Sequence, residues 1–407
     1  MPGLVAGTSA VLLGGTGTTL AVTRALGQAG VPVVILGDGR NDIVARRSRY
    51  CRHYEHFGDE GAEGPAAIAA AWLAWLEHSS SPSVVLPCSD IGLELVARHR
   101  DRIEAAGHRA SEADDAVVLA MLDKEKTYRL ASAGGIRVPR TAQVASMSAA
   151  HEAVDDGIGL PCAVKPVRSD RVSLALPAYP SPKGFLVRDR QSLRAAVEPV
   201  VAIGEPMLVS EFVPGPDSAF CSYYSYIDEQ GVPLFDFTKR KLRQYPPLFG
   251  GGTYHVTEWM PDVAESGRRF FSTVGLRGLG NVEFKRDARD GGLVLIECNA
   301  RFTMATGQVR RAGIDLALVV YNRVVGAPMP ALGEFADGVR LWYPTLDFKG
   351  FRRYRADGAL TASSWVKSLL HLQHFPVFDW RDPVPAATAL RGRLRRPRPI
   401  PGEAVRV

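Results

Sequence analysis

Two glutamates, an asparagine and an arginine lie close together near residue 290, and their side chains suit metal and phosphate chemistry. Residues 281–301 read NVEFKRDARDGGLVLIECNAR, and the Asp-Gly-Gly sequence between two apolar-alternating runs predicts a β-hairpin. Because side chains alternate along a strand, the polar members of the two runs share one face. They are Asn281, Glu283, Lys285, Glu297, Asn299 and Arg301. The apolar members would form the opposite face: Val282, Phe284, Val294, Ile296 and Cys298.

This register predicts that Glu283 and Glu297 lie directly opposite each other. Like charges directly across a sheet destabilise it, so the arrangement favours a cation bound between the two carboxylates. Two carboxylates and the amide oxygen of Asn299 are hard ligands, typical of Mg²⁺ (or Mn²⁺) held jointly with substrate phosphates. Arg301 would then meet a phosphate or a developing oxyanion. The alternative is a solvated hairpin with two unrelated glutamates.

The spacing of Glu, a gap, and then Glu-x-Asn-x-Arg resembles the metal-binding end of the ATP-grasp superfamily. The resemblance covers about residues 10–325 and rests on several short motifs in the expected order. It implies an α/β fold with four parts: a Rossmann-like N-terminal domain (1–113), a small ATP-binding subdomain (114–210), a hinge and Mg²⁺-binding subdomain (211–330), and a C-terminal extension with a basic Arg/Pro tail (331–407). The two subdomains together form the ATP-grasp domain, 114–330.

Two lysines match the ATP-binding lysines of the superfamily. Lys124 lies in a helix predicted over 119–135, and the resemblance implies that it meets a phosphate of ATP, with Lys126 as the alternative. Lys165 lies in the apolar strand PCAVKPV. An unpaired buried ammonium is too costly, so phosphate oxygens would supply its counter-charge.

The loop that follows departs from the superfamily pattern. ATP-grasp enzymes usually cover the phosphates with a glycine-rich loop, but residues 168–182 contain no glycine. The loop would have to close over ATP with other donors, namely Arg168, Ser169, Arg171 or Lys183.

Residues 207–217, MLVSEFVPGPD, read as a strand that runs into a tight turn. The resemblance implies that the backbone of an inter-domain hinge binds the adenine edge and that an acidic residue holds the ribose hydroxyls. The hinge positions are Glu211, Phe212 and Val213, and the ribose ligand is Asp217. The alternative is an edge strand ended by prolines.

A basic segment follows over 235–254, FDFTKRKLRQYPPLFGGGTY. Four cations over 239–243 and a triple glycine suit the γ-phosphate and an anionic acceptor, with Lys241 as a catalytic candidate beside Arg301. A charged edge strand is the alternative. Within the superfamily the arrangement looks most like the D-aspartate ligase type and the carbamoyl-phosphate-synthetase-like ligases.

The N-terminal segment over 10–37 predicts a strand, a glycine turn, a helix and a second strand. A nicotinamide site using Gly14 to Gly17 and Asp38 is an alternative function, but Leu20 replaces the third glycine of that fingerprint. Such a domain binds no dinucleotide in the ATP-grasp enzymes.

A strand predicted over 83–87 is followed by Ser89 and Asp90, which predict a helix cap. The resemblance offers a second interpretation of Asp90, because the turn after such a strand often faces the acceptor substrate.

The composition, with 46% hydrophobic and 23% charged residues in 407, is typical of a globular protein with two or three domains. No stretch is long and apolar enough to span a bilayer. Five cysteines without paired spacing predict reduced thiols and a cytoplasmic protein, and a metal site at Cys51, His53 and His56 is a minor alternative.

The formal net charge is +6, and five arginines lie within 391–398. We expect a solvated tail there, with contact to a polyanion or membrane surface as the alternative. Residues 364–375 predict an amphipathic helix that packs on the body or on a second subunit, with membrane docking beside the arginine tail as the alternative.

These motifs together predict an ATP-dependent carboxylate–amine ligase that releases ADP and phosphate through an acyl phosphate. Its substrate would be an amino acid such as aspartate or a small peptide. No nucleic acid partner is expected, and a homodimer is possible because dimers are frequent in the superfamily. A nucleotide-binding protein without chemistry stays open as an alternative, as does a nicotinamide-dependent oxidoreductase.

Overall fold

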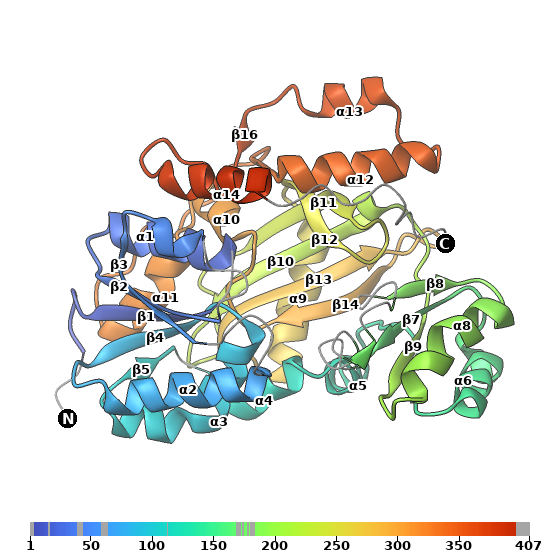
Figure 1. The fold of residues 1–407 in the computed structure, drawn as a ribbon, viewed down its shortest axis with the longest axis horizontal. Helices are drawn as coiled ribbons and strands as arrows, with labels where there is room; N and C mark the ends of the chain where they lie inside the picture. Colours follow the sequence, from blue (N-terminus) through green and yellow to red (C-terminus); the bar gives the residue numbers. More distant parts are fainter. Residues whose placement is uncertain are drawn as a thin grey trace.

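Three β-sheets, each with its own helices, organise the chain in this computed structural model (Figure 1). The structure describes residues 4–14, 17–38, 44–57, 64–111, 113–167, 172, 175–176, 179 and 184–395. The sheets have five, four and seven strands and follow one another along the sequence. The predicted boundaries at 113 and 330 stay predictions, and the last two strands of the largest sheet come from beyond residue 330.

The N-terminal sheet is parallel, with the order β3-β2-β1-β4-β5. Its strands are β1 (Ser9–Leu13), β2 (Val33–Gly37), β3 (Cys51–His56), β4 (Ser83–Pro87) and β5 (Arg109–Ala110). The helix α1 (Gly17–Gln28) joins β1 to β2, so the predicted strand–helix–strand opening is confirmed. A short turn, η1 (Ala45–Arg47), precedes β3. The helices α2 (Pro65–His78) and α3 (Asp90–Ala105) contribute to the core on one face of this sheet.

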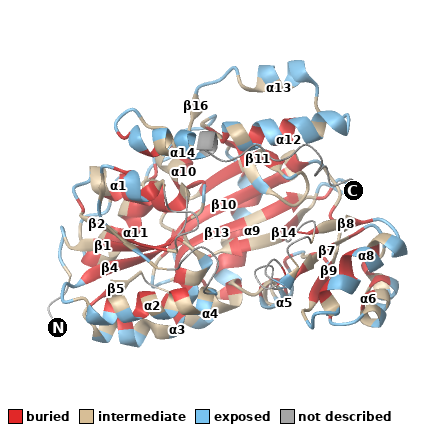
Figure 2. Ribbon diagram, in the orientation of Figure 1, coloured by how far each residue is buried: buried red, intermediate tan, exposed pale blue. Residues whose placement is uncertain are grey.

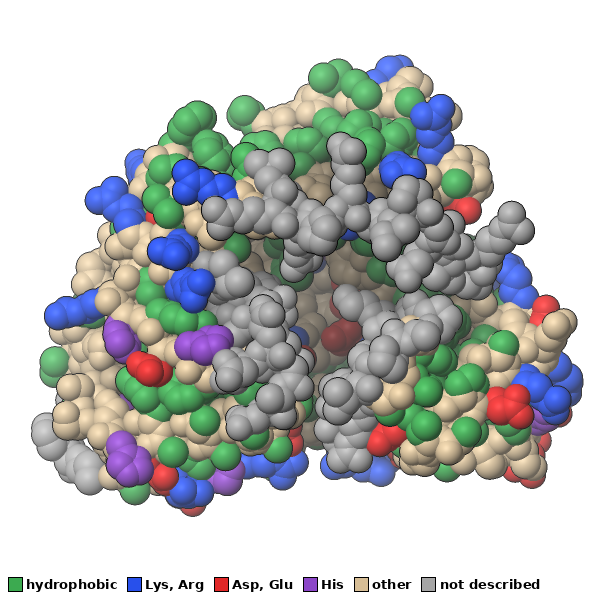
Figure 3. Space-filling model, viewed as in Figure 1, with side chains coloured by type: hydrophobic (Ala, Val, Ile, Leu, Met, Phe, Trp, Pro, Cys, Tyr) green, Lys and Arg blue, Asp and Glu red, His purple; other side chains and the backbone are tan. Residues whose placement is uncertain are grey.

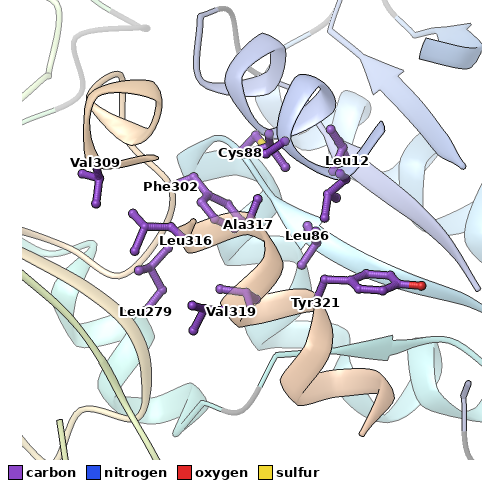
Figure 4. Packing of buried hydrophobic residues seen from close by; sticks show 14 of the residues in the cluster. Leu12, Leu86, Cys88, Leu279, Phe302, Val309, Leu316, Ala317, Val319 and Tyr321 are labelled. Carbon is purple, nitrogen blue, oxygen red and sulfur yellow. The ribbon is translucent and has the colours of Figure 1, made fainter. Parts of the chain in front are cut away.

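The other face of this sheet packs against a helix from the C-terminal half of the chain. The helix α11 (Leu316–Val325) contributes Leu316, Ala317 and Val319 to one cluster with Leu12 and Leu86 of the sheet (Figure 4). The same core includes Phe237 and Leu279 of the seven-stranded sheet, so the two sheets share one hydrophobic core.

The segment that follows the hairpin forms two helices, α10 (Thr306–Arg311) and α11, separated by Gly313 at φ +116°. That backbone conformation favours glycine and ends the first helix.

The smallest sheet is antiparallel and has the order β6-β9-β7-β8. Its strands are β6 (Thr141–Val144), β7 (Cys162–Pro166), β8 (Phe185–Val187) and β9 (Met207–Glu211), and its helical segments are α6 (Met147–Ala153), η2 (Val154–Ile158) and α8 (Arg190–Val201). These elements bury a hydrophobic cluster of their own. The unit lies apart from the other hydrophobic clusters, at the right of Figure 1.

The largest sheet has the order β14-β13-β10-β11-β12-β15-β16. Its strands are β10 (Phe220–Ile227), β11 (Phe237–Tyr245), β12 (Gly251–Thr257), β13 (Gly278–Arg286), β14 (Leu293–Asn299), β15 (Arg340–Trp342) and β16 (Gln373–His374). All neighbours are antiparallel except β15 and β16. The helix α9 (Pro261–Val274) packs on one face of this sheet, whose central strands are largely buried (Figure 2). Val282 and Phe284 of the sheet lie in one hydrophobic cluster with Phe271 of the helix. The opposite face carries Asn281 and Glu283.

The helix predicted over 119–135 is also two helices, α4 (Asp115–Met121) and α5 (Lys124–Ala133). The Asp123 carboxylate interrupts them, because it accepts hydrogen bonds from the backbone N–H groups of Glu125 and Lys126 at 3.0 and 3.2 Å. This cap fixes where α5 begins, and therefore the position of Lys124.

The C-terminal extension adds β15 and β16 to the seven-stranded sheet and contributes three helices: α12 (Pro344–Ala356), α13 (Ala362–Ser368) and α14 (Val384–Arg395). The predicted helix over 364–375 is wrong beyond Ser368, because residues 373–374 form β16 instead. In the part of the chain that the structure describes, no helix is long and apolar enough to cross a membrane.

Candidate active site

The predicted hairpin between β13 and β14 is confirmed. Glu283 lies directly opposite Glu297, and Asn281 lies opposite Asn299. The turn places Gly291 at φ +74°, a conformation that favours glycine, and its N–H donates to the Asp287 carbonyl at 2.7 Å. The turn therefore sets the register that brings the two carboxylates together.

One part of the predicted hairpin is wrong. A β-bulge follows the Glu283–Glu297 pair, so that Phe284 lies opposite Leu295 and Val294 lies opposite Lys285. Ile296 is the extra residue, and it is Leu295 that joins the core. The bulge changes the direction of the backbone at Ile296. As a result, the Ile296 carbonyl accepts hydrogen bonds from Tyr128 Oη at 2.8 Å and Lys124 Nζ at 3.4 Å.

Each of the two opposed carboxylates has a lysine beside it. Lys124 Nζ lies 3.6 Å from a Glu297 oxygen, and Lys241 Nζ lies 3.2 Å from Glu283. The lysines offset the like-charge repulsion that the register alone would impose. The Glu297 side chain is 45% exposed, so its carboxylate is open to a ligand.

The side chains of the hairpin suit a hard cation, but they fill its coordination sphere only if a bound ligand supplies further oxygen atoms. Among the described residues, no group of three or more His, Cys, Asp or Glu side chains could hold a metal. Glu283 and Glu297 supply two carboxylates, and Asn299 adds an amide whose nitrogen lies 3.4 Å from Asn281 Oδ1. Remaining coordination would fall to phosphate oxygens and water, as is usual for Mg²⁺.

Lys124 and Lys165 come from different units, α5 and β7, and lie close enough to interact. Burial, and then the neighbouring Lys124 ammonium, lower the pKa of Lys165. Although burial opposes it, the Glu297 carboxylate raises the pKa of Lys124 above its usual value. The same Lys124 charge is the largest cause that lowers the pKa of Glu297, followed by Lys165 and Arg301 among the cations. The site holds more positive charge than the carboxylates compensate, which favours an anionic ligand.

The four cations of β11 have three different environments. Lys239 and Lys241 are buried on the same sheet face as Glu283, whereas Arg240 pairs with Glu258 on the other face at 2.8 Å. Beyond a β-bulge, Arg243 pairs with Asp347 at 2.7 Å. The alternative of a charged edge strand is wrong, because β11 is paired on both sides.

Lys239 is a candidate that the sequence did not single out. Its Nζ lies 3.3 Å from His255 Nδ1, and among the described residues no carboxylate lies within ion-pair distance of it. Burial, and then Lys241 among its neighbours, lower its pKa to about 8, although Glu283 opposes the shift. The signal available in the sequence was the i, i+2 spacing of Lys239 and Lys241, which places both on one face.

Arg301 lies at the contact between the N-terminal unit and the hairpin. Its Nε donates to Asp90 Oδ1 at 2.6 Å, across 211 residues of sequence. Ser89, not Asp90, caps α3 by accepting from the Gly92 N–H at 3.1 Å. Asp90 is therefore free of the capping role and holds the arginine beside Glu297.

The predicted hinge residues connect the four-stranded sheet to the seven-stranded one. The Glu211 carboxylate accepts from Arg289 at 2.7 Å and from Arg140 at 3.4 Å, so its side chain is used in ion pairs. The Val213 carbonyl accepts from Lys285 Nζ at 2.8 Å, and that ammonium lies 5.1 Å from the centre of the Phe212 ring. The role of these residues in adenine binding stays a prediction.

Asp217 is buried and already hydrogen-bonded through both oxygens. Oδ1 accepts from Gln244 at 2.8 Å, and Oδ2 accepts from Tyr354 Oη at 2.6 Å and the Leu248 N–H at 3.1 Å. A ribose ligand at Asp217 stays a prediction that this geometry does not favour, because the carboxylate would have to give up one of these donors.

Several predicted contributors lie outside the described residues, namely Arg168, Ser169, Arg171 and Lys183 of the phosphate loop and residues 15–16 of the glycine turn.

The described parts of the site surround a hollow between the N-terminal unit and the four-stranded sheet, and Figure 3 shows acidic and basic side chains at its base.

Known proteins share part of this sequence and its overall fold. No protein-family model matches the chain. The D-aspartate ligase of Enterococcus faecium (strain Aus0004) is 23% identical over 275 residues, which cover 65% of this chain and 64% of that protein. The alignment thus spans slightly less than two thirds of the relative.

Solved structures match the chain over more of its length. N5-carboxyaminoimidazole ribonucleotide synthetase, in an ADP complex, has a TM-score of 0.62 at 12% identity, covering 84% of this chain and 82% of that one. Biotin carboxylase from Campylobacter jejuni, in a β,γ-ATP complex, has a TM-score of 0.60 at 15% identity, covering 82% and 74%. This chain has the ATP-grasp fold. An L-amino acid ligase from Bacillus licheniformis shares the ATP-grasp fold with a TM-score of 0.57 at 15% identity, covering 78% and 74%. The predicted resemblance to the superfamily is confirmed.

Proposed function

We propose that this ATP-grasp chain is an ATP-dependent carboxylate–amine ligase. The observation that carries the proposal is the convergence of charges from three segments of the chain on Glu297: Lys124 precedes the four-stranded sheet, Lys165 lies within it, and Arg301 follows the hairpin. Two proteins with a similar fold were solved with ADP and with β,γ-ATP, which supports the binding of a nucleotide between the sheets of this chain. The similarity to a D-aspartate ligase supports an amino acid as one substrate.

The reaction would proceed in two steps. A substrate carboxylate oxygen attacks the γ-phosphorus of ATP, which forms an acyl phosphate and releases ADP. An amine nitrogen then attacks the acyl carbon, loses a proton and expels phosphate, which leaves an amide. Lys124 and Lys165 would neutralise the triphosphate, while Arg301 and Lys241 would stabilise charge on the transferring group and the tetrahedral intermediate.

Glu283, Glu297 and Asn299 would hold a divalent cation, Mg²⁺ or Mn²⁺, which supplies charge neutralisation at the β- and γ-phosphates when bound. The protein's own contribution is to orient these donors. Lys124 lies beside Glu297 and Lys241 lies beside Glu283, so each carboxylate has an opposite charge next to it.

We infer that Lys239 and His255 receive the acceptor's anionic group. Lys239 is buried, shares a sheet face with Glu283 and has a neutral imidazole as its neighbour. A buried ammonium without a carboxylate partner favours an anionic ligand. An acidic substrate such as aspartate would meet this requirement.

The N-terminal unit is proposed to be a Rossmann-like domain without a dinucleotide site. Its parallel sheet with the order β3-β2-β1-β4-β5 supports this assignment. One face of this sheet, with residues of β1 and β4, packs against α11. We therefore assign the N-terminal unit a packing role in the ATP-grasp body. A cytoplasmic location and a homodimer stay predictions.

The proposed function is tested by phosphate release from ATP·Mg²⁺ against a pool of D- and L-amino acids and small peptides, with mass spectrometry of the products. The ligase would be established by release of ADP together with a product whose mass equals the sum of two pool members minus one water. AMP would instead indicate adenylation and contradict the acyl phosphate. ATP binding without turnover would favour the non-catalytic alternative, and stabilisation by NAD(P)⁺ rather than ATP would favour the oxidoreductase.

Arg301→Ala is expected to lower kcat by roughly 10²-fold, because it removes a cation that stabilises developing charge. Its ion-pair partner Asp90 is largely exposed, so the free energy of unfolding should fall by only about 1 kcal/mol or less. Asp90→Ala breaks the same ion pair but keeps the cation, and should retain most of the turnover. Equal losses in both variants would show that the pair, rather than the charge, matters.

ATP binding is expected to take up protons at neutral to alkaline pH. The pKa of Lys165 lies below its usual value in the free protein, and bound phosphate would favour its charged form. Between the lowered pKa and the ordinary value of 10.5, the ammonium therefore gains a proton as ATP binds. Calorimetric titrations in two buffers of different ionisation enthalpy measure the uptake. Lys165→Gln should abolish it, and Lys349→Gln, at an exposed lysine, should not.

Lys239→Met is expected to raise KM for the acidic substrate by about 10- to 100-fold, the value of one lost charge-assisted hydrogen bond, while KM for ATP stays within a factor of about two. Lys239→Arg keeps the charge and should recover part of the loss. Steady-state kinetics with each substrate varied in turn separates the two constants. An equal rise in KM for ATP would assign Lys239 to the nucleotide instead.

A further inference from the structure

The C-terminal extension presents an apolar surface that the rest of the described chain does not cover. Leu372 is 95% exposed, Trp380 85% and Leu370 74%. Phe348, Val366 and Leu390 of the three helices are also exposed. These side chains lie on α12, α13, α14 and their connections, which run along the upper edge of the molecule in Figure 1.

The same surface is basic. Over residues 344–392, one exposed side chain is acidic, Asp357, and seven are basic. The basic ones are Lys349, Arg352, Arg353, Arg355, Lys367, Arg381 and Arg391. Figure 3 shows hydrophobic and basic side chains together along this edge.

Two buried carboxylates hold the extension against the body, so the apolar and basic side chains are displayed by a fixed scaffold. Asp347 pairs with Arg243 of β11 at 2.7 Å. Asp382 pairs with Arg24 of α1 at 2.9 Å and accepts from Ser48 Oγ at 2.7 Å. Stacking of Trp365 on Phe351, with ring centres 4.7 Å apart, fixes α13 on α12.

We propose that this face docks on the surface of an anionic phospholipid membrane. Protein surfaces that bind at a membrane interface combine exposed tryptophan and leucine with arginine and lysine. The apolar side chains enter the boundary of the acyl chains, and the cations contact the lipid headgroups. A second copy of the chain would bring like charges together at this face. A nucleic acid would engage the cations but leave Leu370 and Leu372 in water.

The test is sedimentation of the full chain with vesicles of phosphatidylcholine and phosphatidylserine, compared with vesicles of phosphatidylcholine alone. We expect binding to the anionic vesicles that weakens as salt is added. The variant Leu372→Ser/Trp380→Ser should weaken it about tenfold, and so should Arg352→Glu/Arg353→Glu. These side chains are exposed, and unchanged thermal unfolding would confirm that the variants fold.

Matched controls distinguish this face from the surface as a whole. Val232→Ser changes an exposed apolar residue far from the extension in sequence, and Arg52→Glu/Arg194→Glu makes the same charge change on β3 and α8. Both should bind as the wild type does. The proposal is overturned if no vesicle binds, if the controls weaken binding equally, if DNA binds and vesicles do not, or if the apolar variant abolishes self-association instead. The assay needs no substrate, so its outcome is independent of the ligase activity.

Discussion

Glu297→Gln is expected to lower ATP-dependent turnover by about 10³-fold, the larger end of what one preorganised electrostatic contact supplies. The substitution removes one of two carboxylates that face each other across the hairpin. It also removes the charge that raises the pKa of Lys124, so the lysine loses its partner at the same time. Turnover measured over a range of Mg²⁺ concentrations should show a higher requirement for the metal.

Glu258→Gln is the matched control for this change. Glu258 follows β12 of the same sheet, is 43% exposed where Glu297 is 45%, and pairs with Arg240 on the opposite face. It should keep wild-type turnover at every Mg²⁺ concentration. Wild-type activity of Glu297→Gln at limiting Mg²⁺ would remove Glu297 from the metal site.

Asp347→Ala is expected to lower the free energy of unfolding by about 3–5 kcal/mol, because it leaves a buried arginine without its carboxylate. Asp347 is fully buried and accepts five hydrogen bonds. Two come from Arg243 at 2.7 and 2.8 Å, and the others come from Thr253 at 3.0 Å, Trp342 at 3.0 Å and Trp365 at 2.9 Å. Urea unfolding followed by tryptophan fluorescence reports on this cluster directly.

The double variant Asp347→Ala/Arg243→Met should be less destabilised than Asp347→Ala alone, since no unpaired charge remains. Asp262→Ala breaks an ion pair of similar length, 2.6 Å, whose side chains are 52% and 38% exposed. We expect it to cost about 1 kcal/mol or less. Equal losses for Asp262→Ala and Asp347→Ala would contradict the assigned role of burial.

The sequence predicted those features that depend on local spacing. The turn near Gly291 and the alternation of side chains sufficed to place Glu283 opposite Glu297. The extra residue at Ile296 was not predictable, because nothing in its own chemistry requires a bulge. It follows from how α5 packs against β14, where Tyr128 and Lys124 bind the freed carbonyl.

Features that depend on long-range partners were missed. The ion pair of Arg301 with Asp90 was not predicted, because it joins residues 211 apart, and a contact of Arg301 with phosphate stays a prediction. The contribution of β15 and β16 to the large sheet was not predicted, since two short strands carry too little alternation to stand out. Lys239 was overlooked because a run of cations has the same composition whether it lies in solvent or at a buried site.

The separate cores determine which part of the molecule can move. The N-terminal unit shares its core with the seven-stranded sheet and is tied to the extension through Arg24 and Asp382, so these parts form one base. The four-stranded unit has a core of its own, and the ion pairs of Arg137 and Arg289 lie at its attachment. We expect it to act as a lid that swings over the nucleotide. Opening of that lid, with Lys165 carried away from Lys124, would then set the pace of product release.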